Sequence, residues 1–123
     1  MNKAMVVDDE EDICEFLTQI LKENLEFDVV VALTGEKALE WVATNEFQLC
    51  VVDLKLSTAI TGLDVIDAIR KKWPRTKVVA MSGYVDIGLR QKAEHLGVIG
   101  FFEKPQDIRP DLFESKIKAL IRV

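Results

Sequence analysis

The chain has 123 residues, enough for a single domain with one hydrophobic core. Its composition, 49% hydrophobic and 30% charged, is typical of a globular protein that needs neither disulfides nor a structural metal to fold. The net charge of -5 argues against a nucleic-acid-binding surface, and no apolar run is long enough to span a membrane. Cys14 and Cys50 form no CxxC pair, which fits a protein of the reducing cytoplasm.

Short apolar runs alternate with amphipathic segments five times along the chain. The runs are rich in valine and lack in–out alternation, as expected of strands that are covered on both faces. They cover residues 4–7, 29–33, 49–52, 78–81 and 98–102. We therefore predict five buried strands.

The segments between and after these runs carry apolar residues at helical spacing. The five apolar stripes are Ile13, Phe16, Leu17, Ile20 and Leu21; Ala38, Leu39 and Val42; Leu63, Ile66 and Ile69; Leu89, Ala93 and Leu96; and Phe113, Ile117, Leu120 and Ile121. Residues typical of helix ends flank these stripes. Gly35 and Gly62 precede the second and third stripes, Trp73-Pro74 follows the third, and Gly97 follows the fourth.

This repeating strand–helix pattern predicts an α/β fold with a parallel sheet and helices on both faces. Five units fit a doubly wound sheet of order 2-1-3-4-5, the flavodoxin-like (βα)5 sandwich of three layers. We expect residues 1–123 to form this one domain. In such a sheet, ligands bind beyond the carboxyl ends of the strands, so the residues that end each strand indicate the site.

Candidate site residues follow the first, third, fourth and fifth predicted strands. In chain order these are the acidic run of residues 8–12, then Asp53, Ser82-Gly83 and Lys104-Pro105. The predicted strand order puts the first, third and fourth strands side by side, with the fifth next to the fourth. We therefore expect Asp8, Asp9 and Asp53 to share one pocket, with Ser82 and Lys104 at its rim.

Each of these residues also has a simpler explanation. Acids are favoured at the start of a helix, Lys104 could be a surface lysine, and Ser82 could be a turn hydroxyl. Capping needs only one or two acids, however, and does not explain Asp53. Three neighbouring carboxylates raise one another's pKa unless a cation offsets them, and their hard oxygen ligands suit Mg²⁺. With a lysine and a hydroxyl to hold an anion, the set predicts a phosphoryl-transfer centre.

On these motifs the whole chain resembles the receiver domain of two-component response regulators. The motifs are MVVDDEED at 5–12, VVDLKL at 51–56, VVAMSGY at 78–84 and LGVIGFFEKP at 96–105, and their combination at these intervals is specific. The resemblance implies that Asp53 accepts a phosphoryl group from a phosphohistidine on a sensor histidine kinase or a histidine phosphotransfer protein. It implies no enzymatic activity beyond this autocatalytic phosphotransfer and autodephosphorylation.

The resemblance also implies the roles of the neighbouring residues. The implied ligands of Mg²⁺ are Asp9 and Asp53 directly, the backbone carbonyl of Lys55, and Asp8 through water. Ser82 and Lys104 would hold the phosphoryl oxygens. The Lys104–Pro105 peptide bond is expected to be cis, as is typical of the family.

Phe101 matches the aromatic switch position of the family. Phosphorylation would draw Ser82 toward the anion, let Phe101 turn inward, and remodel the face made by the fourth helix, fifth strand and fifth helix. Phe102 should point to the opposite face of the sheet, so at most one of the two can be the switch. The implied partner at this face is a downstream effector protein or domain, with a phosphorylation-dependent dimer as a further candidate and no direct contact with nucleic acid or membrane.

The loop after Asp53 departs from the family pattern. It reads LKLSTAITG, with Ser57 in place of the usual proline and one extra residue before Gly62, so we expect it to be more mobile. Lys55 and Tyr84 flank the path of water to the phosphoryl group, and our hypothesis is that they tune the lifetime of the aspartyl phosphate. The alternative is that both side chains point to solvent.

Three other functions fit less well. Small phosphatases with an aspartate nucleophile carry a DxDxT-like motif, in which an acid two residues after the nucleophile serves as the general acid–base. In this chain the residue two after Asp53 is Lys55. A flavin or nucleotide binder needs a glycine- or hydroxyl-rich loop after the first strand, and the acidic run of residues 8–12 would repel its phosphate. A degenerate receiver would act only through protein contacts, but the phosphorylation residues are all present. His95 is the only histidine and belongs to no catalytic dyad.

Overall fold

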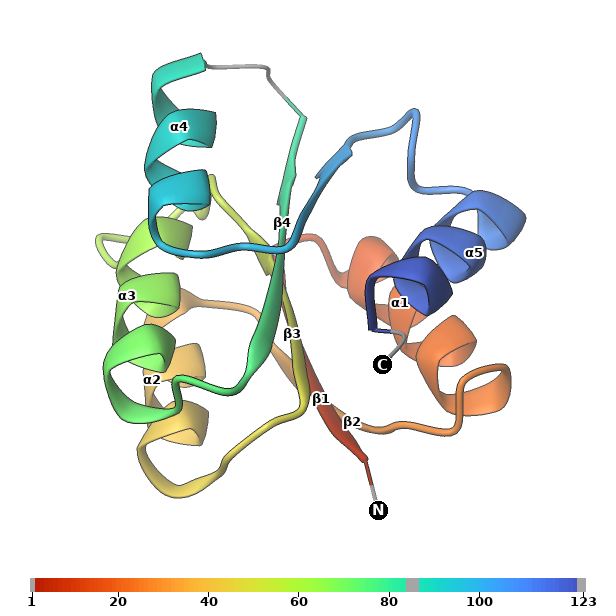
Figure 1. Ribbon diagram of the computed structural model, residues 1–123, viewed down its shortest axis with the longest axis horizontal. Coiled ribbons are helices and arrows are strands. Elements are labelled where there is room, and N and C mark those ends of the chain that lie inside the picture. Colours follow the sequence, from red (N-terminus) through yellow and green to blue (C-terminus); the bar gives the residue numbers. More distant parts are fainter. Residues whose placement is uncertain (1, 84–86, 122–123) are drawn as a thin grey trace.

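In the computed structural model, which describes residues 2–83 and 87–121, five strands form one parallel sheet of order β2-β1-β3-β4-β5 (Figure 1). The strands are β1 (Lys3–Val7), β2 (Asp28–Ala32), β3 (Leu49–Asp53), β4 (Lys77–Ser82) and β5 (Gly100–Glu103). Every neighbouring pair runs parallel. The predicted strand order is confirmed.

Five helices connect and follow these strands in the described part of the chain. They are α1 (Glu11–Glu23), α2 (Gly35–Thr44), α3 (Gly62–Lys72), α4 (Ile87–His95) and α5 (Pro110–Ile121). Helices α1 and α5 cover one face of the sheet, and α2, α3 and α4 cover the other (Figure 1). This is the three-layer flavodoxin-like sandwich expected from the sequence. Within residues 2–83 and 87–121, no helix has both the length and the apolar character that crossing a membrane requires.

The sheet separates two hydrophobic clusters, one under each layer of helices. Along β1, Met5 and Val7 belong to the cluster under α2, α3 and α4, whereas Ala4 and Val6 belong to the cluster under α1 and α5. Successive side chains of a strand point to opposite faces, so a strand covered on both faces is apolar throughout. This explains the unbroken apolar runs in the sequence and fixes the direction of the residues that end each strand.

Two strands are shorter than the predicted runs at one end, whereas the other ends that differ extend by one residue. The fifth strand begins at Gly100 and not at Val98, because the chain is still completing the turn after α4. Gly97 has a φ of 85°, and the Val98 N–H donates to the Ala93 carbonyl at 3.3 Å. The second strand ends at Ala32, and Leu33 beyond it is 37% exposed.

Threonines fix the starts of the second and third helices. The Thr34 hydroxyl accepts the Lys37 N–H at 3.0 Å, and Thr61 forms a reciprocal capping box with Asp64. Such caps satisfy backbone N–H groups that have no partner inside the helix. Both helices therefore begin at the predicted glycines, and Gly62 at the start of α3 lies against the Asp53 carbonyl at the end of β3.

Candidate functional site

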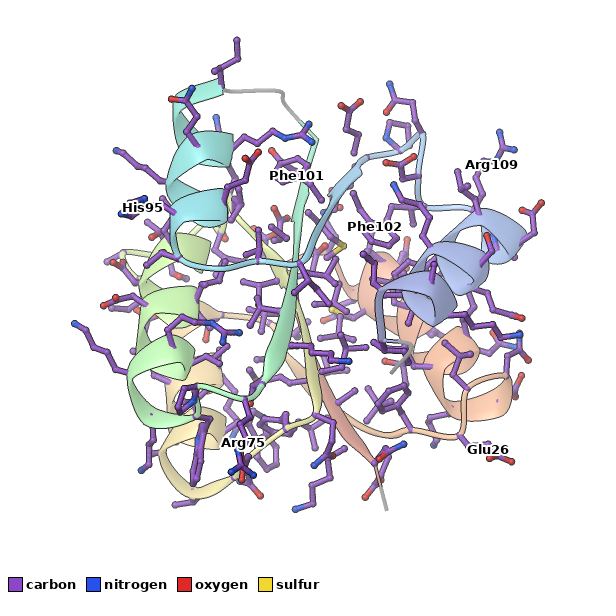
Figure 2. All side chains as sticks on the ribbon, in the orientation of Figure 1. Glu26, Arg75, His95, Phe101, Phe102 and Arg109 are labelled. Atoms are coloured by element: carbon purple, nitrogen blue, oxygen red, sulfur yellow. The ribbon has the colours of Figure 1, made fainter. Side chains whose placement is uncertain are left out.

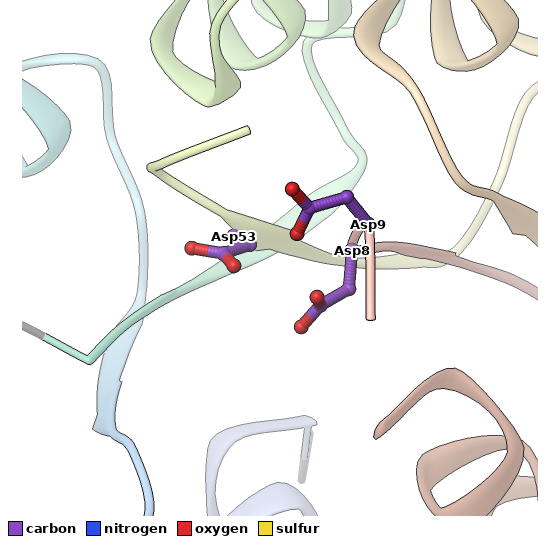
Figure 3. A group of neighbouring side chains, drawn as sticks. All are labelled: Asp8, Asp9 and Asp53. Carbon is purple, nitrogen blue, oxygen red and sulfur yellow. The ribbon is translucent and has the colours of Figure 1, made fainter. Parts of the chain in front are cut away.

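Three aspartates meet at the carboxyl edge of the sheet (Figure 3). Asp8 and Asp9 follow β1 and Asp53 ends β3, and one carboxylate oxygen from each lies within 4.8 Å of the others. Val7 pairs with Val52 in the sheet, so the residues that follow them reach the same level. Asp8 is fully buried and Asp53 is 4% exposed. The predicted meeting of the three carboxylates is confirmed.

Lys104 points directly into this cluster from the end of β5. Its Nζ lies 2.6 Å from Asp8 Oδ2, 2.9 Å from Asp53 Oδ2 and 3.1 Å from Glu10 Oε2. The Lys104 N–H donates to the Ser82 carbonyl at 2.9 Å, which ties the residue to the end of β4. The lysine expected at the rim is thus the cation of the cluster. The peptide bond that follows it, to Pro105, is cis as predicted.

Backbone N–H groups orient the three carboxylates. Glu10 donates to Asp8 Oδ1 at 2.9 Å, Lys55 donates to Asp53 Oδ1 at 3.0 Å, and Ser57 donates to Asp9 Oδ2 at 3.1 Å. Hydrogen bonds to an ionised acceptor are stronger than neutral ones and have preferred directions. Each aspartate is therefore held by the main chain as well as by its place at a strand end.

Burial dominates the electrostatics of the cluster. It raises the pKa of Asp8 and of Asp53, although hydrogen bonds from Lys104 and from the backbone oppose the rise. Burial also lowers the pKa of Lys104, but hydrogen bonds to Asp8 and Asp53 and their charges outweigh it and raise that pKa overall. The buried carboxylates therefore favour a proton or a cation close to them, and one lysine supplies only part of that charge.

The loop between Asp53 and Gly62 packs closely on the strand that precedes it. A Cβ atom on Gly62 would lie 2.1 Å from the Asp53 carbonyl oxygen, so only glycine allows this approach. Farther out, Ile60 lies against Gly35 at the start of α2, where a Cβ atom would be 2.4 Å from the Ile60 carbonyl oxygen. These contacts, together with the Ser57 hydrogen bond, fix the path of the loop. Its expected mobility stays a prediction.

Phe101 and Phe102 point to opposite faces of the sheet, as the alternation predicts (Figure 2). Phe102 is buried against Phe113, with ring centroids 5.2 Å apart. Phe101 is half-buried toward α4, and the Arg90 guanidinium lies 4.7 Å from its ring centroid. Of the two rings, Phe101 is therefore the one at the surface between α4 and β5.

The structure also describes three of the four remaining predicted residues. Ser82 is buried at the end of β4, beside the strand that carries Asp53. Lys55 is exposed, as is His95 (Figure 2). Tyr84 lies outside the described residues.

Four residues near the site make contacts that the sequence did not predict. Glu10 was grouped with the acids of the helix start, yet its side chain makes no cap and contacts Lys104. The Cys14 thiol donates a hydrogen bond to the Asp8 carbonyl oxygen at 3.2 Å, and burial raises the pKa of that thiol to about 12. The other two are Ser57, described above, and Asp107, which accepts the Glu103 N–H. Only Ser57 left a signal in the sequence, the missing proline.

Comparison with known proteins identifies the family. The family described as "Response regulator receiver domain" matches residues 4–115. Response regulator protein PilR of Pseudomonas aeruginosa is 33% identical over 106 residues, covering 86% of this chain and 23% of PilR. Photosynthetic apparatus regulatory protein RegA of Rhodovulum sulfidophilum is 30% identical over 104 residues, covering 84% of this chain and 55% of RegA. The chain thus spans from under a quarter to about half of the length of these relatives.

Solved structures agree with this match. A CheY-like response regulator receiver domain protein from Methanospirillum hungatei has a TM-score of 0.89 and 25% identity, covering 98% of this chain and 94% of that one. A response regulator from Burkholderia pseudomallei was solved with a phosphorylated aspartic acid, a calcium ion and citrate. It has a TM-score of 0.83 and 26% identity, and the match covers 98% of this chain and 66% of that one. The family match, the relatives and the solved structures all indicate the same family, and this chain belongs to the receiver domains of two-component response regulators.

Proposed function

We propose that Asp53 accepts a phosphoryl group from a phosphohistidine on a sensor histidine kinase or a histidine phosphotransfer protein. The observation that carries this proposal is the buried carboxylate of Asp53, set between two further aspartates and 2.9 Å from the Lys104 ammonium group. A carboxylate oxygen would attack phosphorus, and the P–N bond would break with its electron pair going to the imidazole nitrogen, which takes up a proton. The Burkholderia relative, which carries a phosphorylated aspartic acid, supports the same chemistry here.

The donor set of the cluster fits Mg²⁺. Three carboxylates offer oxygen ligands close together, and Lys104 offsets only part of their charge. Asp9, Asp53 and the backbone carbonyl of Lys55 would hold the ion directly, with Asp8 acting through water. When bound, Mg²⁺ neutralises charge on the phosphoryl oxygens and leaves coordination positions for them.

Lys104 and Ser82 would hold the phosphoryl group on Asp53. The Lys104 ammonium group has three N–H donors and already lies beside a carboxylate oxygen of Asp53. It can therefore bind phosphoryl oxygens after a small movement, while Asp8 continues to hold it. The Ser82 hydroxyl, at the end of the neighbouring strand, would donate to another of these oxygens.

The proposed output is a change in the surface made by α4, β5 and α5. Movement of Ser82 toward the anion would make room for Phe101, which now lies under the Arg90 guanidinium at the edge of α4. Such a switch needs two packings that differ by only a few kcal/mol. A downstream effector protein or domain, or a second phosphorylated copy, would recognise the new surface. We expect the protein to act in the cytoplasm, and the free thiols of Cys14 and Cys50 are consistent with that.

A small phosphodonor tests the proposal without the cognate kinase. The chain is incubated with acetyl phosphate, with and without Mg²⁺, and its intact mass is recorded. We expect a gain of one phosphoryl group that requires Mg²⁺ and disappears in Asp53→Asn. No gain under any condition would favour a degenerate receiver, and turnover of unrelated phosphoesters would favour a phosphatase.

The lifetime of the aspartyl phosphate is a separate proposal. Lys55 is exposed next to the site, and its backbone N–H already contacts Asp53. We expect its cationic side chain to influence the entry of water, together with Tyr84. The test compares the dephosphorylation half-lives of the wild type, Lys55→Ala and Tyr84→Ala, and equal half-lives would contradict the idea.

A further inference from the structure

Ser57 joins the irregular loop to the acidic cluster. Its backbone N–H donates to Asp9 Oδ2 at 3.1 Å, across 48 residues of sequence. Ser57 itself is exposed, so its side chain is not needed to fill the core. The contact depends on the main-chain N–H, which every residue except proline has.

Asp9 depends on this hydrogen bond more than its neighbours depend on theirs. Asp8 and Asp53 are both buried and both paired with Lys104. Asp9 is only half-buried, and within residues 2–83 and 87–121 it forms no ion pair. Of the three carboxylates, it is thus the one whose orientation is least fixed by packing and charge, and the Ser57 N–H is the contact that restrains it.

The donor is held in place by rigid parts of the fold. Beyond Ser57, Ile60 packs against Gly35 at the start of α2, and Gly62 packs against the Asp53 carbonyl at the end of β3. Before it, the Lys55 N–H is bonded to Asp53. The N–H of Ser57 therefore lies between two anchored ends of one loop, and it presents a fixed donor to a carboxylate from another strand.

We propose that the main-chain N–H of Ser57 positions Asp9 for a divalent cation, and that cation binding in turn stabilises the loop of residues 54–61. This inference rests on the proposed Mg²⁺ site. A carboxylate with one oxygen held by an N–H still has lone pairs for a cation. Hydrogen-bond partners of metal ligands orient those ligands, and losing one typically weakens metal affinity tenfold or more. Ser57 is accordingly a positioning residue and does not touch the cation.

Calorimetric titration with Mg²⁺ separates this role from a general effect on the loop. Ser57→Pro removes the N–H, whereas Ser57→Ala keeps it and removes only the hydroxyl. Ala59→Pro introduces the same ring at an exposed position two residues later. We expect Ser57→Pro to raise the Kd for Mg²⁺ about tenfold, and the two control variants to stay within about twofold of the wild type. A Ser57→Pro chain that binds Mg²⁺ like the wild type would overturn the inference.

Hydrogen exchange of single amides tests the contact without any proline. We expect Asp9→Ala to reduce the protection of the Ser57 amide and to leave the Lys55 amide, which is bonded to Asp53, unchanged. In the wild type, Mg²⁺ should increase the protection of the Ser57 amide. Equal protection of Ser57 in wild type and Asp9→Ala contradicts this inference alone, whereas a wild type that binds no Mg²⁺ and gains no phosphoryl group contradicts the proposed function as well.

Discussion

The ammonium group of Lys104 lies 2.9 Å from the carboxylate of Asp53, although 51 residues separate them in the chain. The two side chains are 11% and 6% exposed, so the pair is screened little by water. The same ammonium group also contacts Asp8 at 2.6 Å. A buried cation shared by buried acids is a poor source of stability but a prepared site for an anion.

The first prediction concerns this lysine. Lys104→Met keeps the length of the side chain and removes its charge, and we expect the initial rate of phosphorylation by acetyl phosphate to fall roughly a hundredfold. The reason is that one charged donor to the phosphoryl oxygens is lost. Time courses of intact mass measure the rate. Lys22→Met, on an exposed part of α1, is the matched control, and equal rates in the two variants would count against a role for Lys104.

A second prediction concerns stability and Mg²⁺. Without Mg²⁺, we expect Asp53→Asn to raise the free energy of unfolding by about 1 kcal/mol, because it removes a buried negative charge beside Asp8 and Asp9 while Lys104 keeps its contact with Asp8. Linkage predicts that Mg²⁺ at about ten times its Kd stabilises the wild type by about 1.4 kcal/mol, and Asp53→Asn much less. Urea denaturation with and without Mg²⁺ measures both effects. Asp12→Asn, an exposed acid of the same charge, should respond to Mg²⁺ like the wild type.

A third prediction separates the two neighbouring phenylalanines. Phe102 is fully buried against Phe113, so Phe102→Ala should cost about 3–5 kcal/mol of unfolding free energy. Phe101 is half-buried at the edge of α4, so Phe101→Ala should cost less than half as much and leave phosphorylation of Asp53 intact. Denaturation curves and intact mass provide the two measurements. Equal losses of stability would mean that the two rings are not divided between core and surface.

The sequence predicted the fold because the fold follows general rules. Unbroken valine-rich runs indicate covered strands, alternating units require a parallel sheet, and the sheet order brings strand ends together. Asp8, Asp9 and Asp53 could be placed in one cluster from these rules alone. The fourth helix was harder to predict from the sequence, because its apolar stripe is weak. Of the predicted Leu89, Ala93 and Leu96, only Ala93 is fully buried, and Leu96 lies beyond the end of α4.

The contacts made by individual side chains and loops could not be predicted in this way. Glu10 and Glu11 are equivalent in the sequence, yet only the path of the chain into α1 brings Glu10 to Lys104. The Ser57 hydrogen bond depends likewise on how the loop folds back over Asp9. Such contacts are set by the conformation of short irregular segments, for which periodicity gives no information.

A fourth prediction uses a contact of this kind, at Asp107. Its carboxylate accepts the Glu103 N–H at 2.9 Å and pairs with Lys116 at 3.2 Å, and the backbone hydrogen bond first, then Lys116, lower its pKa. A lowered pKa contributes stability above the ordinary value of 3.8, which is lost as pH falls through the folded-state pKa. We expect Asp107→Asn to destabilise the fold by about 1 kcal/mol at pH 7.

That difference between wild type and Asp107→Asn should shrink as the pH falls below 3.8, because the wild-type carboxylate is then protonated as well. Denaturation at a series of pH values measures it. Asp28→Asn, an exposed aspartate on β2, controls for the loss of one negative charge. A difference that is the same at every pH would exclude the carboxylate charge as its source.

The position of the phosphoryl group on the chain decides whether Asp53 is the phosphoacceptor. After reaction with acetyl phosphate and Mg²⁺, borohydride reduces an aspartyl phosphate to homoserine, and peptide mass mapping then identifies the converted position. We expect homoserine at position 53 and at neither Asp8 nor Asp9. Conversion at one of those two aspartates, or a phosphoryl group found on His95, would contradict this expectation.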